Sequence, residues 1–119
     1  MKITERTVGD VTILDLQGRL VLEDGDQVFK DACDALVRDG HRKFLLNLEG
    51  VSFLDSAGVG AIVWKYVTIK KKGGALKLLR LSQRSHHVLL ITKLLSIIET
   101  FDSETDAVQS FESTDRAQT

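Results

Sequence analysis

The residues of this chain with the clearest chemical meaning lie in the run FLDSAGVG, where Asp55 and Ser56 are followed by Gly58 and Gly60. A strand-like apolar segment precedes the run and an amphipathic segment follows it, so Ser56 is predicted to stand where a helix begins. The first turn of a helix carries free backbone N–H groups and the positive end of the helix dipole, which together favour a phosphate. The two glycines keep this turn slim, so a phosphate or another molecule's backbone can approach.

The same position has a purely structural interpretation. In it the Ser56 hydroxyl caps the helix and stabilises the fold by about 1 kcal/mol. Spacing alone leaves both interpretations open. The glycine pair does not form a GxGxxG fingerprint and the chain has no GxxxxGK[ST] loop, so the motif does not indicate a nucleotide-binding enzyme.

Three further groups have weaker claims to a site. Trp64 is either an exposed anchor of an interface or, as we expect, a side chain buried between helices. The adjacent rings of His86 and His87 fall on different faces of a helix, which disfavours a metal site and favours solvated surface. Ser52 is expected to be an ordinary loop serine rather than a second phosphate acceptor.

Composition narrows the possible functions. The length of 119 residues suits one domain, and the formal net charge of -1 offers no strong positive field to nucleic acid or to an anionic membrane. Cys33 is the only cysteine, so no intrachain disulfide or cysteine-based zinc cage can form. The three histidines give no convincing catalytic arrangement, so we expect no enzyme, no cofactor and no metal. No apolar stretch approaches the roughly 20 residues of a membrane span, so we expect a cytoplasmic protein.

Short apolar runs predict the strands. Residues 1–22 form two strands joined by a turn at Gly9 and Asp10, with Gly18 ending the second strand. Two further strands are predicted over 43–48 and 75–81, and a short last strand over 97–101. The segment between 49 and 54 is expected to be a loop.

Apolar stripes at helical spacing predict four helices, over 26–39, 57–72 and 83–92 and from 103 onward. Asp24 or Asp26 is expected to cap the first helix, Gly40 to end it in the left-handed conformation, and Ser82 to cap the third. Strands that alternate with helices after an antiparallel opening pair indicate an α/β fold. We therefore expect a mixed sheet of four or five strands with helices mainly on one face, forming a single domain over 1–112 with a flexible tail over 113–119.

The run FLDSAGVG resembles the D-S-[SA]-G-[LV]-G signature of STAS domains, the family of bacterial anti-sigma factor antagonists. The similarity covers most of the chain. It includes the Gly18-Arg19-Leu20 step, the segment LNLEGVSFLDS, the glycine pair before residue 75 and the late stretch SIIETFDSETDAV. Related domains also occur in stress-signalling complexes, anion-transporter tails and lipid-transport assemblies, so the resemblance is more specific for the family than for the partner.

The resemblance implies a partner switch. In this family the unmodified antagonist binds an anti-sigma factor that is also a serine kinase, and thereby frees a sigma factor. The kinase then phosphorylates the serine that follows the Asp, and a separate serine phosphatase restores binding. Matching the motif puts the phosphorylated serine at Ser56, with Asp55 helping to present its hydroxyl. Ala57 stands at the second motif serine, which leaves Ser56 as the only acceptor in the motif.

We expect the start of this helix and the loop before the first helix to form one partner-facing surface, because loops that follow adjacent parallel strands meet at one sheet edge. The expected partner-binding residues are Glu23, Asp24, Asp55, Ala57, Gly58, Gly60 and Trp64. Sigma antagonists commonly follow the Gly-x-Leu step with Asp, whereas Val21 stands here, so the loop looks about one residue longer. A phosphate on Ser56 would add to the charge of Asp55, and of Asp24 or Glu49 from nearby loops.

Two alternatives stay open. One is a nucleotide-binding domain or weak NTPase that uses the same helix start, although LEGVSFLDSAG contains no Lys or Arg to meet phosphates. The other is a constitutive scaffold or subunit in a signalling or transport assembly, in which Ser56 is only a cap. The sequence favours no oligomeric state.

Overall fold

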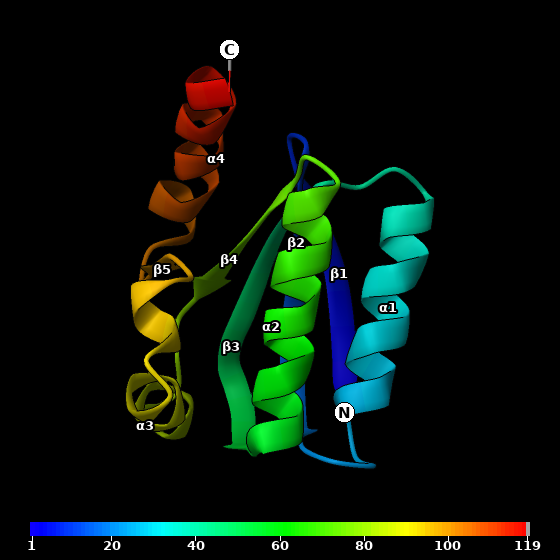
Figure 1. The fold of residues 1–119 in the computed structure, drawn as a ribbon, viewed down its shortest axis with the longest axis vertical. Helices are drawn as coiled ribbons and strands as arrows, with labels where there is room; N and C mark the ends of the chain where they lie inside the picture. Colours follow the sequence, from blue (N-terminus) through cyan, green and yellow to red (C-terminus); the bar gives the residue numbers. More distant parts are fainter. Residues whose placement is uncertain (119) are drawn as a thin grey trace.

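The computed structural model describes the backbone of residues 1–118 and the side chains of residues 1–112 other than those of Ile91 and Leu95. Five strands form one mixed sheet in the order β1-β2-β3-β4-β5 (Figure 1). They are β1 (Lys2–Val8), β2 (Val11–Leu20), β3 (Lys43–Leu54), β4 (Ala75–Leu79) and β5 (Thr100–Phe101). The β1–β2 pair is antiparallel and the other three pairs are parallel, as expected for an opening hairpin followed by crossovers.

Helices cover both faces of the sheet unequally. They are α1 (Asp26–Arg38), α2 (Ser56–Lys71), α3 (Gln83–Ile91) and α4 (Glu104–Gln118), with a 3₁₀ turn, η1 (Leu94–Ser96), after α3. The helices α1 and α2 lie side by side on one face, and α4 packs against the opposite face (Figure 1). The fold is therefore the predicted α/β arrangement, with most helices on one face.

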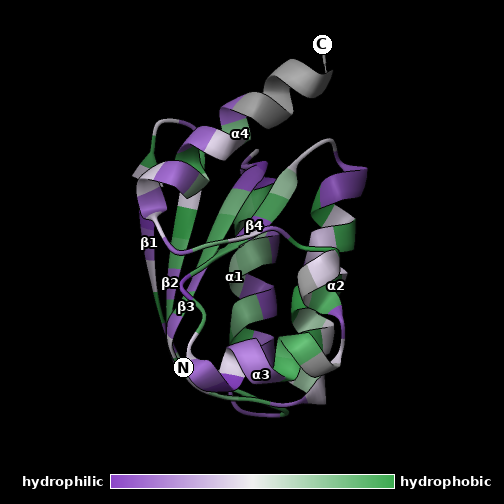
Figure 2. Cartoon of the chain, turned by 90° about the vertical axis from the view of Figure 1, so that its left-hand side faces the viewer, coloured by the Kyte–Doolittle hydropathy of each residue, from purple (hydrophilic) through white to green (hydrophobic). Residues whose placement is uncertain are grey.

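Two apolar cores hold these layers together. The larger core lies between the sheet and α1, α2 and α3, and includes Leu14, Phe29, Ile62 and Leu89. The smaller core joins the opposite face to α4, through Val11, Ile13, Leu45, Leu79, Ala107 and Phe111. In Figure 2 apolar residues gather along the inner strands of the sheet, whereas the helices mix apolar and polar residues. Alternation along β2 explains it, because successive side chains point to opposite faces.

Several local predictions are confirmed. The turn at Gly9 and Asp10 separates β1 from β2. Gly40 has φ +97° just after α1, as its role at a helix end requires. Ser82 caps α3, because its hydroxyl accepts a hydrogen bond from the Ser85 amide at 3.1 Å.

Three local predictions are wrong. Gly18 does not end β2, which continues to Leu20, and the expected loop over 49–54 is the second half of β3. Two irregularities in the parallel β2–β3 ladder, near Gly18 and between Asp15 and Gln17, let both strands continue together. The residue before α1 is Gly25, without a side-chain cap, while Asp26 accepts hydrogen bonds from the amides of Glu23 and Gln27.

No helix within residues 1–118 is both long enough and apolar enough to cross a membrane. The predicted tail over 113–119 falls on residues whose side chains, and for 119 also the backbone, lie outside those described. The division into a domain over 1–112 and a flexible tail stays a prediction.

Candidate partner-binding site

Asp55, and not Ser56, caps α2. Its backbone is extended, and the Gly58 amide donates a hydrogen bond to its Oδ1 at 2.9 Å. The helix begins one residue earlier than predicted, so the capping role moves back by one residue as well. Ser56 becomes the first helical residue, and its exposed hydroxyl makes no hydrogen bond with any residue that the structure describes.

The second oxygen of Asp55 reaches a different loop. Asp55 Oδ2 accepts a hydrogen bond from the Leu22 amide at 3.1 Å, which ties the start of α2 to the loop between β2 and α1. The hydrogen bonds from the Gly58 and Leu22 amides hold the pKa of the Asp55 carboxyl below its ordinary value. Asp55 is thus a fixed carboxylate that sets where Ser56 stands.

Gly58 and Gly60 lie on opposite sides of α2. Gly58 is buried, and a Cβ there would stand 2.0 Å from the Leu20 carbonyl oxygen. Its lack of a side chain lets α2 press against the end of β2. Gly60 is exposed, and a Cβ there would meet no heavy atom within 4 Å. The structure therefore places Gly58 inside the fold, away from the surface on which it was expected, and leaves Gly60 on that surface.

A groove runs along α2 beside α3. Its volume is about 620 Å³, and Ser56 is at the end where α2 starts. Asp55 is the one charged residue among the described residues that line it: Leu54, Asp55, Ser56, Val59, Gly60, Val63, Trp64, Val67, Val88 and Thr92. The groove is therefore an apolar surface with a hydroxyl at its mouth.

Trp64 stands on the wall of this groove and is 64% exposed, so the expectation that it is buried between helices is wrong. The helix α2 carries apolar residues on more than one face, because Val67 is also exposed while Ile62 is fully buried. Local periodicity could not decide which apolar face the sheet would cover.

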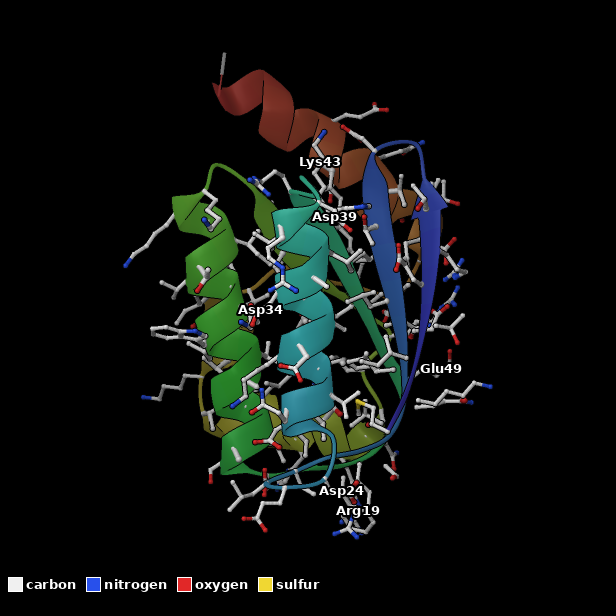
Figure 3. All side chains as sticks on the ribbon, turned by 90° about the vertical axis from the view of Figure 1, so that its right-hand side faces the viewer. Arg19, Asp24, Asp34, Asp39, Lys43 and Glu49 are labelled. Carbon is white, nitrogen blue, oxygen red and sulfur yellow. The ribbon has the colours of Figure 1, made fainter. Side chains whose placement is uncertain are left out.

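The acidic residues of the β2–α1 loop lie at the same end of the molecule as the starts of α1 and α2. Glu23 and Asp24 are exposed, in a tight turn that two backbone hydrogen bonds close between Val21 and Asp24. Figure 3 shows Asp24 beside Arg19, and the two side chains are 3.7 Å apart. Glu49 lies on the β1 side of the sheet in the same view, so the expectation that it adds to the charge around Ser56 is wrong.

Of the weaker candidates, His86, His87 and Ser52 do not line the groove. His86 and His87 are exposed on α3. Ser52 is in β3, where its hydroxyl donates to the Gly18 carbonyl at 3.2 Å, so it is not a loop residue. Cys33 is buried, and burial raises the pKa of its thiol to about 12, which keeps it protonated and unreactive. No group of three or more potential metal ligands occurs among the described residues.

Sequence reasoning missed an aromatic residue flanked by two cations. Phe53 is 43% exposed, and the Cζ atoms of Arg84 and Arg19 lie 4.3 Å and 5.4 Å from the centroid of its ring. Arg19 and Phe53 are paired residues of β2 and β3. That pairing is visible only when residues 49–54 are known to form a strand, and no local signal brings Arg84 to the same place.

Comparison with known proteins gives concordant results. The sequence model described as "STAS domain" matches residues 2–107. An anti-sigma F factor antagonist of Paenibacillus polymyxa is 29% identical over 102 residues, which are 86% of this chain and 87% of that protein. The crystal structure of TM1081 from Thermotoga maritima is 28% identical, covers 92% of this chain and 94% of its own, and has a TM-score of 0.86.

The anti-sigma factor antagonist SpoIIAA, from Bacillus, shares the fold in two chemical states. The unphosphorylated form has a TM-score of 0.79 at 19% identity and covers 94% of this chain and 97% of its own. The phosphorylated form has a TM-score of 0.71 at 20% identity, with 92% and 98% covered.

Proposed function

This chain belongs to the STAS domain family, and from that premise we propose that it is an anti-sigma factor antagonist whose binding is switched off by phosphorylation of Ser56. The proposed partner is an anti-sigma factor that is also a serine kinase, and a serine phosphatase restores the binding form. One observation carries the proposal: Ser56 offers an exposed hydroxyl, bonded to none of the described residues, at the mouth of an apolar groove. A kinase can reach this hydroxyl without opening the fold.

The unmodified surface suits a protein partner. Trp64 and the valines of the groove supply apolar contact area, and exposed aromatic residues beside apolar pockets are typical of binding hot spots. Ala57 and Gly60 are small, so a partner's backbone can come close to the first turns of α2. Glu23 and Asp24 add charge on the neighbouring loop, which favours a partner with basic residues there.

Phosphate would change this surface and leave the fold intact. It adds a charge of about -1.5 to -2 at the groove mouth, next to the carboxylate of Asp55. The positive end of the α2 dipole stabilises the phosphate locally, so the free protein tolerates it. A partner that packs apolar groups against Ser56 would have to desolvate the phosphate, which is costly. The phosphorylated form of SpoIIAA, with its similar fold, supports this view.

Pull-down with the anti-sigma factor kinase of the same cell tests the proposal. Ser56→Ala should be retained constitutively and Ser56→Asp should be retained poorly, although one carboxylate replaces only part of the phosphate charge. Thr105→Asp is the matched control, because it places the same charge in the first turn of α4, away from the groove. Retention of Ser56→Asp at the wild-type level would favour a constitutive scaffold instead.

A further inference from the structure

We infer that Arg84 and Phe53 receive a carboxylate from an acidic segment of the protein partner, an inference that rests on the proposed function because it extends that partner surface. Arg84 and Phe53 come from separate elements, the start of α3 and the end of β3. The Arg84 guanidinium lies over the Phe53 ring at 4.3 Å from its centroid. This contact holds the cation in place by the attraction between a positive group and the ring face.

Among the described residues, no carboxylate pairs with the Arg84 guanidinium. Its N–H groups make no hydrogen bond within the part of the chain that the structure describes, and the guanidinium contacts the Phe53 ring. Arg19, on the same ring, is within 3.7 Å of Asp24. A guanidinium that lies over a ring keeps the N–H donors along its edge available, and that fork matches a carboxylate in two parallel hydrogen bonds.

The ring also prepares the cation for binding. Phe53 is 43% exposed, and its ring covers one side of the Arg84 guanidinium. A cation that is already fixed loses less side-chain entropy when an anion arrives. Arg and aromatic residues are enriched among the residues that contribute most to protein interfaces. Arg84 with Phe53 therefore has the properties of an interface anchor with positive charge.

Arg84 and Phe53 lie next to the apolar groove, which favours a segment of a protein as the ligand. Arg84 and Phe53 line a second hollow of about 330 Å³, together with Gln83, His87, Leu54 and Val88. Leu54 and Val88 also line the apolar groove that ends at Ser56. One segment can therefore place apolar side chains in the groove and an Asp or Glu at Arg84. A phosphate on Ser56 would face the same segment with like charge, which weakens its binding further.

NMR titration of the full-length, isotope-labelled protein tests this inference with defined probes. Two short synthetic amphipathic peptides share the same apolar residues, and one carries Glu where the other carries Gln. The Glu peptide should shift the amide signals of Phe53, Arg84 and His87 in a saturable manner. The Gln peptide should bind roughly tenfold more weakly or worse, because its neutral amide offers the guanidinium one acceptor oxygen and no negative charge, so the bidentate ion pair cannot form.

Variants locate the effect. Arg84→Gln should lower the affinity for the Glu peptide to that for the Gln peptide, with an otherwise native spectrum. Arg38→Gln, which removes an exposed arginine from α1, should behave as wild type. Equal binding of the two peptides, no shift with the Glu peptide, or an Arg84→Gln variant that binds as wild type would overturn the inference. So would GTP that shifts these amides at lower concentration than the Glu peptide, since the pair would then be a nucleotide site.

The two proposals fail separately. A Ser56 switch that operates on the kinase while the peptides ignore Arg84 removes this inference and leaves the proposed function. If the peptides bind at Arg84 but the Ser56→Asp variant binds the kinase as tightly as wild type, the proposed function is wrong and this inference stands.

Discussion

The carboxylate of Asp55 and the amide of Leu22 are joined by a hydrogen bond of 3.1 Å across 33 residues of sequence. This bond connects the two loops of the proposed partner surface, since the other oxygen of the same carboxylate holds the first turn of α2 through Gly58. The relative position of Ser56 and the acidic loop is therefore fixed by one side chain. A partner that contacts both Ser56 and the acidic loop would therefore bind a preformed surface.

Removal of this carboxylate should cost stability, whereas removal of the neighbouring hydroxyl should not. Asp55→Ala loses the cap of α2 and the bond to Leu22, so the free energy of unfolding should fall by about 1–2 kcal/mol. Ser56→Ala removes an exposed hydroxyl that bonds to none of the described residues, so the free energy of unfolding should change by no more than about 0.5 kcal/mol. Urea denaturation of both variants measures the difference. A larger loss in Ser56→Ala would mean that the serine is the cap.

The two glycines of α2 should respond in opposite directions to alanine. Gly58→Ala puts a Cβ where the Leu20 carbonyl leaves 2.0 Å, so α2 must shift and stability should fall by about 1–3 kcal/mol. Gly60→Ala meets open space and should stabilise the helix by up to about 1 kcal/mol. Thermal unfolding of the pair gives the sign of each effect. Similar changes in both would contradict the packing of α2 described above.

Trp64 should matter for binding and not for folding. Because its side chain is 64% exposed, Trp64→Ala should change the free energy of unfolding by no more than about 0.5 kcal/mol. Its affinity for the anti-sigma factor should fall by roughly tenfold or more if it is a hot spot. Leu90→Ala is the matched control, because Leu90 is an exposed apolar residue of α3 that does not line the groove. Calorimetric titration of the two variants should separate them, and equal affinities would remove Trp64 from the surface.

Acid should weaken the attachment of α4 to the hairpin. The Arg6 guanidinium bridges Asp15 and Glu104, with N–O distances of 2.6 Å and 2.7 Å, and lowers the pKa of both carboxyls. These pKa values are lower in the folded chain than in the unfolded chain, where they are about 4. The carboxylates therefore make their full contribution to stability above about pH 4. That contribution is lost as the pH falls through the lower folded values.

The variant Arg6→Gln should therefore lose less stability than wild type between neutral pH and about pH 3, while being less stable at neutral pH. Urea denaturation at several pH values gives both curves. Arg38→Gln should follow the wild-type curve, since Arg38 is exposed on α1. Parallel curves for Arg6→Gln and wild type would show that the bridge does not carry the pH dependence.

The fold class followed from local patterns, because each helix and strand that forms the layers has its own period in the sequence. The second half of β3 could not be predicted in this way. Residues 49–54 become a strand because they pair with β2 in an irregular ladder that no local pattern encodes. The exposure of Trp64 depends on where α3 lies, and α2 is apolar on several faces. The role of Ser56 as the phosphorylated serine stays a prediction, and its neighbour Asp55 took the capping role because the helix begins one residue earlier than the sequence indicated.

The affinity of stoichiometrically phosphorylated protein for the anti-sigma factor kinase tests the central claim most directly. Mass spectrometry should first place the phosphate on the peptide that contains Ser56. Calorimetric titration of the unmodified and modified forms should then show at least roughly tenfold weaker binding after phosphorylation, or about 1.4 kcal/mol. Equal dissociation constants for the two forms, or a phosphate found elsewhere while the kinase is active, would contradict the proposed switch.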